Sequence, residues 1–179
     1  MSEARQAWWG WHQLSDEWVR RLVRQAGISP GDLVLDIGAG TGALTRGLLA
    51  AGARVVAVEL HPGRAHELRR RFSADAVRVV RADATELRLP HQPFRVVANL
   101  PFASTTAILR RLLDPRRPLV GAELIVPRHV AARWSAGRGC DARRWAPVFD
   151  VATTARVPRT AFRPSPPADA AVLTVVRRR

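Results

Sequence analysis

Residues 32–42, which read "DLVLDIGAGTG", join an apolar run to a glycine-rich loop. The run at 33–37 has the length and composition of a buried strand. Gly38, Gly40 and Gly42 follow it, and residues without a Cβ allow the backbone to pass close to a bound small molecule. A dinucleotide-binding loop has the spacing G-x-G-x-x-G, whereas the third glycine comes one residue earlier here. The segment predicts a strand that ends in a ligand-binding loop, with a purely structural turn as the alternative.

The rest of the chain alternates strand-like and helix-like segments. A helix is predicted to start at Ser15, as its cap, and to end at Gly27. Alternation of this kind predicts an α/β fold, a mostly parallel seven-stranded sheet flanked by helices on both faces. The Gly- and Arg-rich residues 135–144 are expected to form a mobile loop. Beyond 33–37, strands are predicted at 53–60, 76–83, 94–100, 118–126, 147–157 and 169–176, and helices at 43–52, 63–72, 105–113 and 128–134.

The composition indicates one domain with a polyanionic partner. Of the 179 residues, 47% are apolar, which is enough for one substantial core. The 29 basic residues, all of them arginine, exceed the 15 acidic ones and give a net charge of +14. Arginine presents a planar donor fork that matches phosphate and stacks on bases, so a nucleic acid is the expected partner. Genomic base composition is the alternative cause of the bias toward arginine.

Several classes of protein are excluded by what the chain lacks. Cys140 is the single cysteine, so the chain has no internal disulfide framework and no Cys/His cluster with metal-ligand spacing. The first residues lack the apolar core of a signal peptide, and no segment reaches the roughly 18 apolar residues of a membrane span. We therefore expect a cytoplasmic protein without a metal.

Acidic residues end the next two strands. Glu59 ends "VVAVEL", where its carboxylate can accept hydrogen bonds from both ribose hydroxyls, and Asp83 ends "VVRAD", where it can accept one from an adenine amino group. Taken singly, Glu59 also reads as a surface acid and Asp83 as a turn cap. Ligands of such sheets bind at the carboxyl ends of the strands, and the glycine spacing resembles the loop that holds the amino-acid end of S-adenosylmethionine. The three strand ends together predict a site for that cofactor.

The fourth strand ends in "VANLPFASTT", residues 97–106. An adenine N6 is a poor nucleophile because its lone pair is delocalised into the ring, and two acceptors aimed at its N–H bonds would make it more like a free amine. The Asn99 side-chain oxygen can be one acceptor, and the Leu100 carbonyl, presented by the turn at Pro101, can be the other. Phe102 offers a face on which an extruded base can stack. The alternative is a proline turn with Asn99 as a local cap and Phe102 in the core.

These segments together resemble the rRNA adenine N6-methyltransferases. The resemblance covers nearly the whole chain and rests on "VLDIGAGTGALT", "VVAVELHP", "VRVVRADATEL", "VVANLPFASTT" and "FRPSPPADAAV". Phe102 after the proline, followed by Ser-Thr-Thr, is more similar to the erythromycin-resistance (Erm) branch than to the 16S rRNA dimethyladenosine transferases. The resemblance implies a Rossmann-like class I methyltransferase fold that uses S-adenosylmethionine. It also implies N6-methylation of an adenine in 23S rRNA at the peptidyl transferase centre, which confers resistance to macrolide-type antibiotics.

The resemblance also implies roles for single residues. Asn99, Leu100, Pro101 and Phe102 match the catalytic motif. The family opens with G-Q-N-F-L-x-D, whereas residues 10–16 here read "GWHQLSD". The cofactor-binding set that the resemblance implies is His12, Leu14, Gly38, Ala39, Gly40, Gly42, Glu59, Leu60, Asp83, Ala84 and Asn99.

The expected organisation is a Trp-rich N-terminal arm at 1–14 and one catalytic domain at 15–179. Trp8, Trp9 and Trp11 suit a lid, an RNA-stacking surface or the packing of the arm onto the core. Because the helical C-terminal domain that is usual in the family is not expected here, the chain resembles the short single-domain members. We expect a monomer that binds 23S rRNA before ribosome assembly is complete. Arginines outside the motifs are expected to contact phosphates, with a solvated surface as the alternative: Arg110, Arg111, Arg138, Arg143 and Arg144.

Other functions fit the same segments less well. A 16S rRNA dimethyltransferase is disfavoured by Phe102, and a DNA adenine or protein glutamine methyltransferase by Leu100, where N-P-P-F/Y would be expected. A non-catalytic RNA-binding or ribosome-assembly module could retain the fold, but the intact Asn99 argues against it. No G-x-S-x-G motif occurs, so hydrolase chemistry is not expected.

Overall fold

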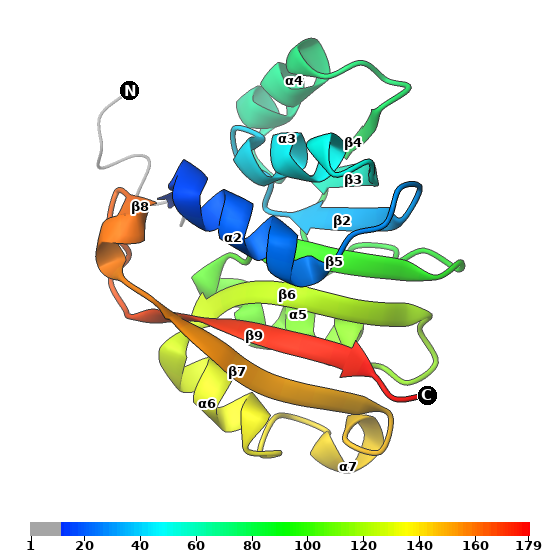
Figure 1. Cartoon of the computed structure of the whole chain (residues 1–179), viewed down its shortest axis with the longest axis vertical. Coiled ribbons are helices and arrows are strands. Elements are labelled where there is room, and N and C mark those ends of the chain that lie inside the picture. Colours follow the sequence, from blue (N-terminus) through cyan, green and yellow to red (C-terminus); the bar gives the residue numbers. More distant parts are fainter. Residues whose placement is uncertain (1–11) are drawn as a thin grey trace.

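The computed structural model describes residues 12–179. Its centre is a seven-stranded sheet with the order β4-β3-β2-β5-β6-β9-β7 (Figure 1). β9 (Ala170–Arg177) runs antiparallel to β6, and β7 (Phe149–Val157) runs antiparallel to β9. The predicted mostly parallel sheet is confirmed. The parallel strands are β2 (Leu33–Ile37), β3 (Arg54–Val58), β4 (Val77–Val80), β5 (Phe94–Asn99) and β6 (Leu119–Pro127).

The order of the strands reverses at β2. The chain moves outward from β2 to β3 and β4, and then returns to the other side of β2 as β5, followed by β6. The register pairs Val34 of β2 with Val55 of β3 on one side and with Arg95 of β5 on the other. Such a reversal leaves a crevice outside the carboxyl ends of the strands, which is where α/β sheets bind ligands.

Helices cover both faces of the sheet (Figure 1). One face carries α2 (Asp16–Ala26), α3 (Ala43–Ala50) and α4 (Pro62–Arg71), and the other carries α5 (Thr105–Leu112) and α6 (Arg128–Ser135). As predicted, α2 follows Ser15 and ends at Gly27, which has a φ of 56°; the Ser15 side chain makes no capping hydrogen bond. The two-sided cover explains the uninterrupted apolar runs in the sequence.

The central strand β5 shows this cover directly. Successive side chains of a strand point to opposite faces. Val96 and Ala98 accordingly belong to the apolar layer beneath α5 and α6, and Val97 belongs to the layer beneath α2 and α3. All three are at most 1% exposed. The strand that delivers Asn99 is therefore held by a core on each side.

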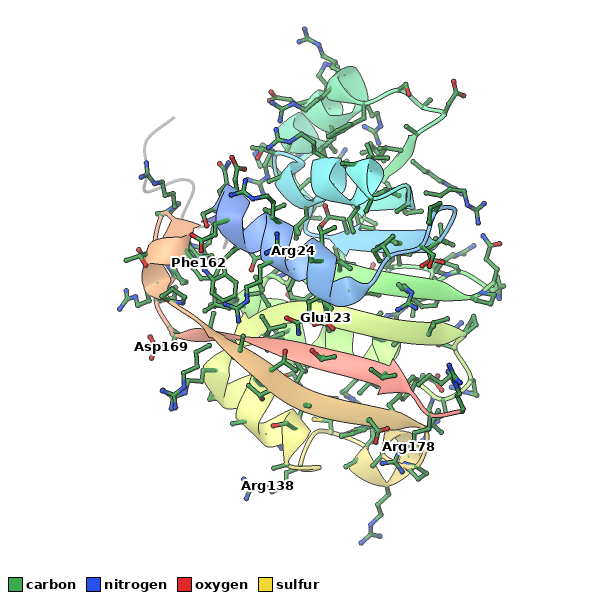
Figure 2. All side chains as sticks on the ribbon, viewed as in Figure 1. Arg24, Glu123, Arg138, Phe162, Asp169 and Arg178 are labelled. Carbon is green, nitrogen blue, oxygen red and sulfur yellow. The ribbon has the colours of Figure 1, made fainter. Side chains whose placement is uncertain are left out.

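The start of the described chain is tied to the proline-rich segment between β7 and β9. β1 (Gln13–Leu14) pairs antiparallel with β8 (Phe162–Arg163), which follows the 3-10 turn η2 (Arg159–Ala161). Leu14 and Phe162 are both buried, and Phe162 lies inside this corner in Figure 2. Residues 12–14 thus form part of the folded structure, whereas the tryptophans predicted as a lid or stacking surface lie outside the described residues.

The Gly- and Arg-rich residues 135–144 are more ordered than their composition indicated. Their last residues begin α7 (Ala142–Trp145), so the loop prediction is wrong there. Trp145 stacks on Trp134 with ring centroids 5.3 Å apart and donates a hydrogen bond to the Cys140 carbonyl (2.9 Å). A Cβ at Gly139 would lie 2.4 Å from the Trp134 indole, so only glycine fits against it. Stacking of two distant indoles orders the segment.

One acid is buried within the sheet beneath α2. Glu123 of β6 is 6% exposed and lies beside the C-terminal turn of α2 in Figure 2. Its Oε2 accepts hydrogen bonds from Thr174 Oγ1 (2.8 Å) and Gln25 Nε2 (3.1 Å). Burial raises the pKa of the Glu123 carboxyl to about 7, against the smaller opposing effect of the Thr174 hydrogen bond.

We expect Glu123 to make the stability of the fold depend on pH. Because the folded-state pKa lies above the ordinary value of 4.5, its contribution is fully present below about pH 4.5 and is lost as the pH rises through about 7. In urea denaturation at pH 5, 6, 7 and 8, the wild type should lose more free energy of unfolding than Glu123→Gln, which stays neutral. Glu67→Gln, at an exposed position on α4, is the control and should follow the wild type. Parallel curves for wild type and Glu123→Gln would contradict this account.

Candidate functional site

A pocket of about 940 Å³ lies at the edge of the sheet where the parallel strands end. In Figure 1 this is the left edge, near β8. Residues at or shortly after the carboxyl ends of four strands line it: Gly38, Glu59, Asp83 and Asn99. Its volume is within the range of ligand and cofactor sites. The structure brings together all the strand ends that the sequence pointed to.

Most of the predicted site residues line this pocket, and two do not. The residues that line it are His12, Leu14, Gly38, Ala39, Glu59, Leu60, Asp83, Ala84, Asn99, Leu100, Pro101 and Phe102. Gly40 and Gly42 lie behind it. Gly40 donates its N–H to Glu59 Oε2 (2.8 Å). A Cβ at Gly42 would lie 2.7 Å from the Phe72 ring, so this glycine allows the loop to pack on the end of α4.

Gly38 brings two loops into contact. Its φ is 78°, which favours glycine, and a Cβ there would lie 3.3 Å from Pro101 Cδ and 3.4 Å from the Asn99 carbonyl oxygen. Glycine at this position therefore relieves a tight contact between the loop after β2 and the turn after β5, and it suits the positive φ.

The Glu59 carboxylate is 3% exposed and already holds three protein donors. Oε2 accepts from Gly40 N (2.8 Å), and Oε1 accepts from His61 N (2.8 Å) and Arg64 Nη2 (3.1 Å). A carboxylate offers about four acceptor positions, so about one remains, on Oε2. The predicted contact with two ribose hydroxyls therefore requires Arg64 to move away from Oε1.

Two more acids stand at the pocket, and they differ in burial. Asp36 is 1% exposed and accepts a hydrogen bond from Thr45 Oγ1 (2.7 Å); burial raises the pKa of its carboxyl to about 7. Asp83 is exposed, and the hydrogen bonds that its Oδ1 accepts from Thr85 lower the pKa of its carboxyl. Asp83 thus caps a turn through Oδ1, as one of the two alternatives predicted, while its Oδ2 stays available for a ligand.

Asn99 has one end of its amide engaged and the other unpaired. Its Nδ2 donates to the His12 carbonyl (2.8 Å), which identifies Oδ1 as the remaining atom. Oδ1 is buried and has no hydrogen-bond donor within residues 12–179. A buried acceptor without a donor costs about 1–3 kcal/mol, so such an atom calls for an explanation. A ligand donor would supply one.

The turn after Asn99 is rigid. The Pro101 carbonyl accepts from Ser104 N (3.1 Å) and Thr105 Oγ1 (3.0 Å), and Leu100 N donates to the Ile125 carbonyl (3.1 Å). Leu100 is 2% exposed, so its side chain anchors the turn in the core. Its carbonyl receives no hydrogen bond from the described part of the chain. Asn99 and Leu100 thus present two open acceptors on consecutive residues.

Part of the pocket lining comes from His12, from Phe102 and from the segment between β8 and β9. The Phe102 ring is half-buried, and its centroid lies 5.9 Å from that of His12 at a tilt of 45°. His12 Nδ1 lies 2.9 Å from the Pro164 carbonyl. Pro164, Ser165 and Pro167 line the pocket and were not predicted as site residues, nor were Asp36 and Arg64. Asp36 could have been found, because it lies two residues before the first glycine of the loop.

The predicted RNA-contacting arginines divide into two groups. Arg110, Arg111 and Arg144 line a second pocket on the α5 side of the sheet, whereas Arg138 and Arg143 do not. Arg138 projects from the lower edge of the molecule in Figure 2. Arg110 already pairs with Asp141 (3.2 Å), and Arg111 donates to the Leu87 carbonyl (2.7 Å).

Within residues 12–179, no group of His, Cys, Asp and Glu side chains is arranged to hold a metal ion. In the same part of the chain, no helix combines the length and the apolar character needed to cross a membrane.

A comparison with protein families matches residues 10–179 to the family described as "Ribosomal RNA adenine dimethylase". The chain belongs to this family. The predicted recognition of an rRNA adenine methyltransferase is confirmed at that level. Members of the family and its structural neighbours are methyltransferases that use S-adenosylmethionine, in agreement with the predicted cofactor.

Similar proteins include two rRNA methyltransferases and one antibiotic-resistance protein. The chain is 38% identical over 147 residues to the rRNA adenine N-6-methyltransferase of Corynebacterium diphtheriae, covering 80% of this chain and 57% of that protein. It is 39% identical over 149 residues to the mycinamicin-resistance protein MyrB of Micromonospora griseorubida (81% and 47%). It is 39% identical over 188 residues to the ribosomal RNA small subunit methyltransferase A of Synechococcus sp. strain JA-2-3B'a(2-13) (94% and 66%). The chain spans 47% to 66% of the length of these relatives.

Solved structures confirm the predicted class I methyltransferase fold. The 23S rRNA methyltransferase ErmE superimposes with a TM-score of 0.80 at 30% identity, covering 92% of this chain and 69% of that one. A dimethyladenosine transferase from Plasmodium falciparum also has a TM-score of 0.80, at 24% identity and with 93% and 64% coverage, and supports the fold alone.

The occupancy of Glu59 leads to opposite expectations for two neighbouring residues. Glu59→Ala should weaken S-adenosylmethionine binding in calorimetry, because the predicted acceptor for the ribose is lost. Arg64→Ala should strengthen it several-fold, because a donor that competes for Oε1 is removed. Arg69→Ala, at an exposed position on the same helix, is the control and should leave the affinity unchanged. If Arg64→Ala weakened binding as much as Glu59→Ala, Arg64 would be holding Glu59 for the cofactor rather than competing with it.

Proposed function

We propose that this chain transfers a methyl group from S-adenosylmethionine to the exocyclic N6 of an adenine in 23S rRNA, and thereby gives resistance to macrolide-type antibiotics. The observation that carries the proposal is the buried, unpaired Oδ1 of Asn99 beside the open carbonyl of Leu100. An exocyclic amine has two N–H bonds, and these two acceptors can take one each.

The pocket fits the cofactor by its size and its acceptors. Gly38 leaves space that a Cβ would fill, and Asp36, Glu59 and Asp83 offer carboxylate oxygens to the amino, ribose and adenine donors of such a ligand. When bound, S-adenosylmethionine would supply the methyl group together with a positively charged sulfur as leaving group.

The residues of the chain contribute orientation and electrostatics. Hydrogen bonds from N6–H to Asn99 Oδ1 and the Leu100 carbonyl would turn the nitrogen lone pair out of conjugation with the ring and toward the methyl group. Both acceptors are fixed before the base arrives, Asn99 through His12 and Leu100 through its buried side chain and Ile125. Preorganised groups of this kind need no rearrangement during the reaction. Phe102 at the pocket wall would stack on the extruded base.

The choice of 23S rRNA over 16S rRNA rests on two observations. The chain is similar to ErmE at 30% identity and to the resistance protein MyrB at 39%. Phe102 follows the proline of the motif, as in the Erm branch that the sequence resembles. A 16S substrate is the second candidate, because the likeness to the Synechococcus small subunit methyltransferase extends over 94% of this chain.

Labelled methyl transfer to protein-free 23S rRNA, with 16S rRNA and DNA as competitors, tests the proposal. Primer extension should then stop at one adenine near the peptidyl transferase centre. Methylation of 16S rRNA alone would replace the first candidate by the second, and transfer to neither RNA would reject both.

Asn99→Ala should lower the rate of transfer by about 10²-fold or more, which is the scale of losing one preorganised hydrogen-bonding group. Cofactor affinity, measured by calorimetry, should change little. Gln92→Ala removes an exposed amide before the other end of the same strand and serves as the control. A fully active Asn99→Ala enzyme would rule out the orientation mechanism.

Phe102→Leu should spare cofactor binding and impair the use of RNA. The substitution keeps apolar bulk but removes the aromatic face, and base stacking contributes about 1–3 kcal/mol, so kcat/KM for RNA should fall about 5- to 150-fold. Phe72→Leu, at the half-buried ring that packs on Gly42, is the matched control. An equal loss in both variants would point to a general packing defect instead of stacking.

A further inference from the structure

A second pocket, of about 460 Å³, lies on the α5 side of the sheet. Three segments build it: the loop after β4, the second half of α5 with the residues that follow, and residues 140–145, which include α7. Five arginines line it, and two aspartates accompany them, which gives a net charge of +3 (five minus two). The arginines are Arg110, Arg111, Arg116, Arg117 and Arg144, and the aspartates are Asp114 and Asp141.

We propose that this second pocket binds phosphodiester groups of the RNA substrate and so holds the strand whose adenine enters the first pocket. The inference rests on the proposed RNA substrate and assigns it a second point of attachment on this chain. Neither the glycine loop nor the turn at 99–102 takes part in it.

Both aspartates of the pocket are neutralised by the arginines beside them. Asp114 pairs with Arg116 (2.8 Å), and the hydrogen bonds from that side chain hold the pKa of Asp114 down at about 2. Asp141 pairs with Arg110 at 3.2 Å. Each pair fixes one guanidinium in place without leaving an exposed negative charge. An anion entering the pocket therefore meets the remaining arginines without uncompensated repulsion.

The remaining three arginines have unused donors. Arg117 and Arg144 make no side-chain hydrogen bond or salt bridge within residues 12–179, although the charge of Arg144 helps to lower the pKa of Asp114. Arg111 donates one Nη2 bond to the Leu87 carbonyl, whereas its Nε is buried and has no acceptor in the described structure. A buried donor without an acceptor is costly unless a ligand satisfies it. The planar fork of arginine matches the oxygens of a phosphate.

The position of the pocket suits a strand that also reaches the first site. Ala82, Asp83 and Ala84 line the first pocket, and Thr85, which donates to Asp83 Oδ1 (2.7 Å), lines the second. Helix α5 also joins them, because it begins just after Ser104 of the first pocket and carries Arg110 and Arg111 near its end. Eight residues of helix span about 12 Å, which corresponds to about three or four stacked nucleotides at ~3.4 Å each.

The test neutralises Arg117 and Arg144, the two arginines of the pocket that make no side-chain hydrogen bond or salt bridge in the described part of the chain. Arg117→Gln/Arg144→Gln is compared with Arg20→Gln/Arg24→Gln, which removes the same charge from α2 on the opposite face of the sheet (Figures 1 and 2). The probe is a transcript of the 23S rRNA region around the peptidyl transferase centre, with a 16S transcript beside it. The dissociation constant is measured between about 50 and 200 mM salt. Cofactor calorimetry and thermal melting verify that all variants fold.

The pocket variant should lower the slope of log Kd against log salt by about 1.4, since each lost single-strand phosphate contact removes about 0.7. Ethylation of particular RNA phosphates should interfere with binding to the wild type and to the α2 variant, but no longer with binding to the pocket variant. Equal slope changes in the two variants, or an unchanged interference pattern, would overturn the proposal. A third outcome would also overturn the proposal. If inorganic phosphate competed with RNA for the wild type but not for the pocket variant, and the ethylation interference pattern were the same in both, the pocket would bind free phosphate instead of the RNA backbone.

Cys140 gives a second measurement that needs no substitution. It is the single cysteine of the chain, it is half-buried and it lines this pocket. Bound RNA should slow its reaction with a thiol reagent several-fold, and an unchanged rate would contradict the proposal. Methyl transfer is not part of either readout. If the wild type did not methylate RNA but the interference pattern changed in the pocket variant, only the catalytic proposal would be rejected. If methylation were normal and the interference pattern did not change, only the proposal for the second pocket would be rejected.

Discussion

The site depends on the close approach of two backbones at Gly38. Gly38 has a φ of 78°, and a Cβ there would lie 3.3 Å from Pro101 Cδ and 3.4 Å from the Asn99 carbonyl oxygen, so glycine suits this close approach of the loop after β2 to the turn after β5. The order of the sheet reverses at β2, and β5 is the neighbouring strand to which the chain returns. The groups that face a methyl donor and those that face a base must be neighbours for transfer to occur, and this contact makes them so. Burial of β5 on both faces fixes the turn from below, because neither Asn99 nor Leu100 can shift without moving a strand at the centre of the core.

The polar groups of the pocket differ in how many of their hydrogen-bonding positions the protein itself already fills. Glu59 is surrounded by donors from the glycine loop, from His61 and from Arg64, so a ligand must compete for it. Asn99 is the reverse case, since its amide nitrogen is engaged and its oxygen is left without a partner. A protein gains nothing in stability from an unpaired buried acceptor. Glu59 therefore also organises the glycine loop, whereas the unpaired Oδ1 of Asn99 is explained best by a reacting base.

Much of this arrangement could be predicted from the sequence, because it follows from local patterns of residues. The same dependence on local patterns explains which features could not be predicted. The strands and the three strand-end residues Gly38, Glu59 and Asp83 follow from periodicity and from the rule that ligands gather at the carboxyl ends of strands. Contacts between distant segments carry no such signal. The pairing of β1 with β8 brings His12 to Pro164, and the Trp134–Trp145 stack orders residues expected to be a mobile loop. Gly42 shows the same limit within a motif, because its neighbour is Phe72, thirty positions away, rather than the ligand pocket.

The excess of arginine shows why position matters more than number. The Arg177 guanidinium donates hydrogen bonds to three carbonyls, those of Leu119, Pro115 and Arg117. It also lies 4.7 Å from the centre of the Phe149 ring, so its donors stabilise the fold and are not available to RNA. Arg178 pairs with Asp150. A net charge of +14 attracts a polyanion from any direction, whereas retention of a strand in one register requires donors that the protein has left unused in one place. Arg111, Arg117 and Arg144 meet that condition together, beside a loop whose other side faces the first pocket. Under the proposed RNA binding, all the arginines contribute to the long-range attraction, whereas only these three would hold the strand at one place.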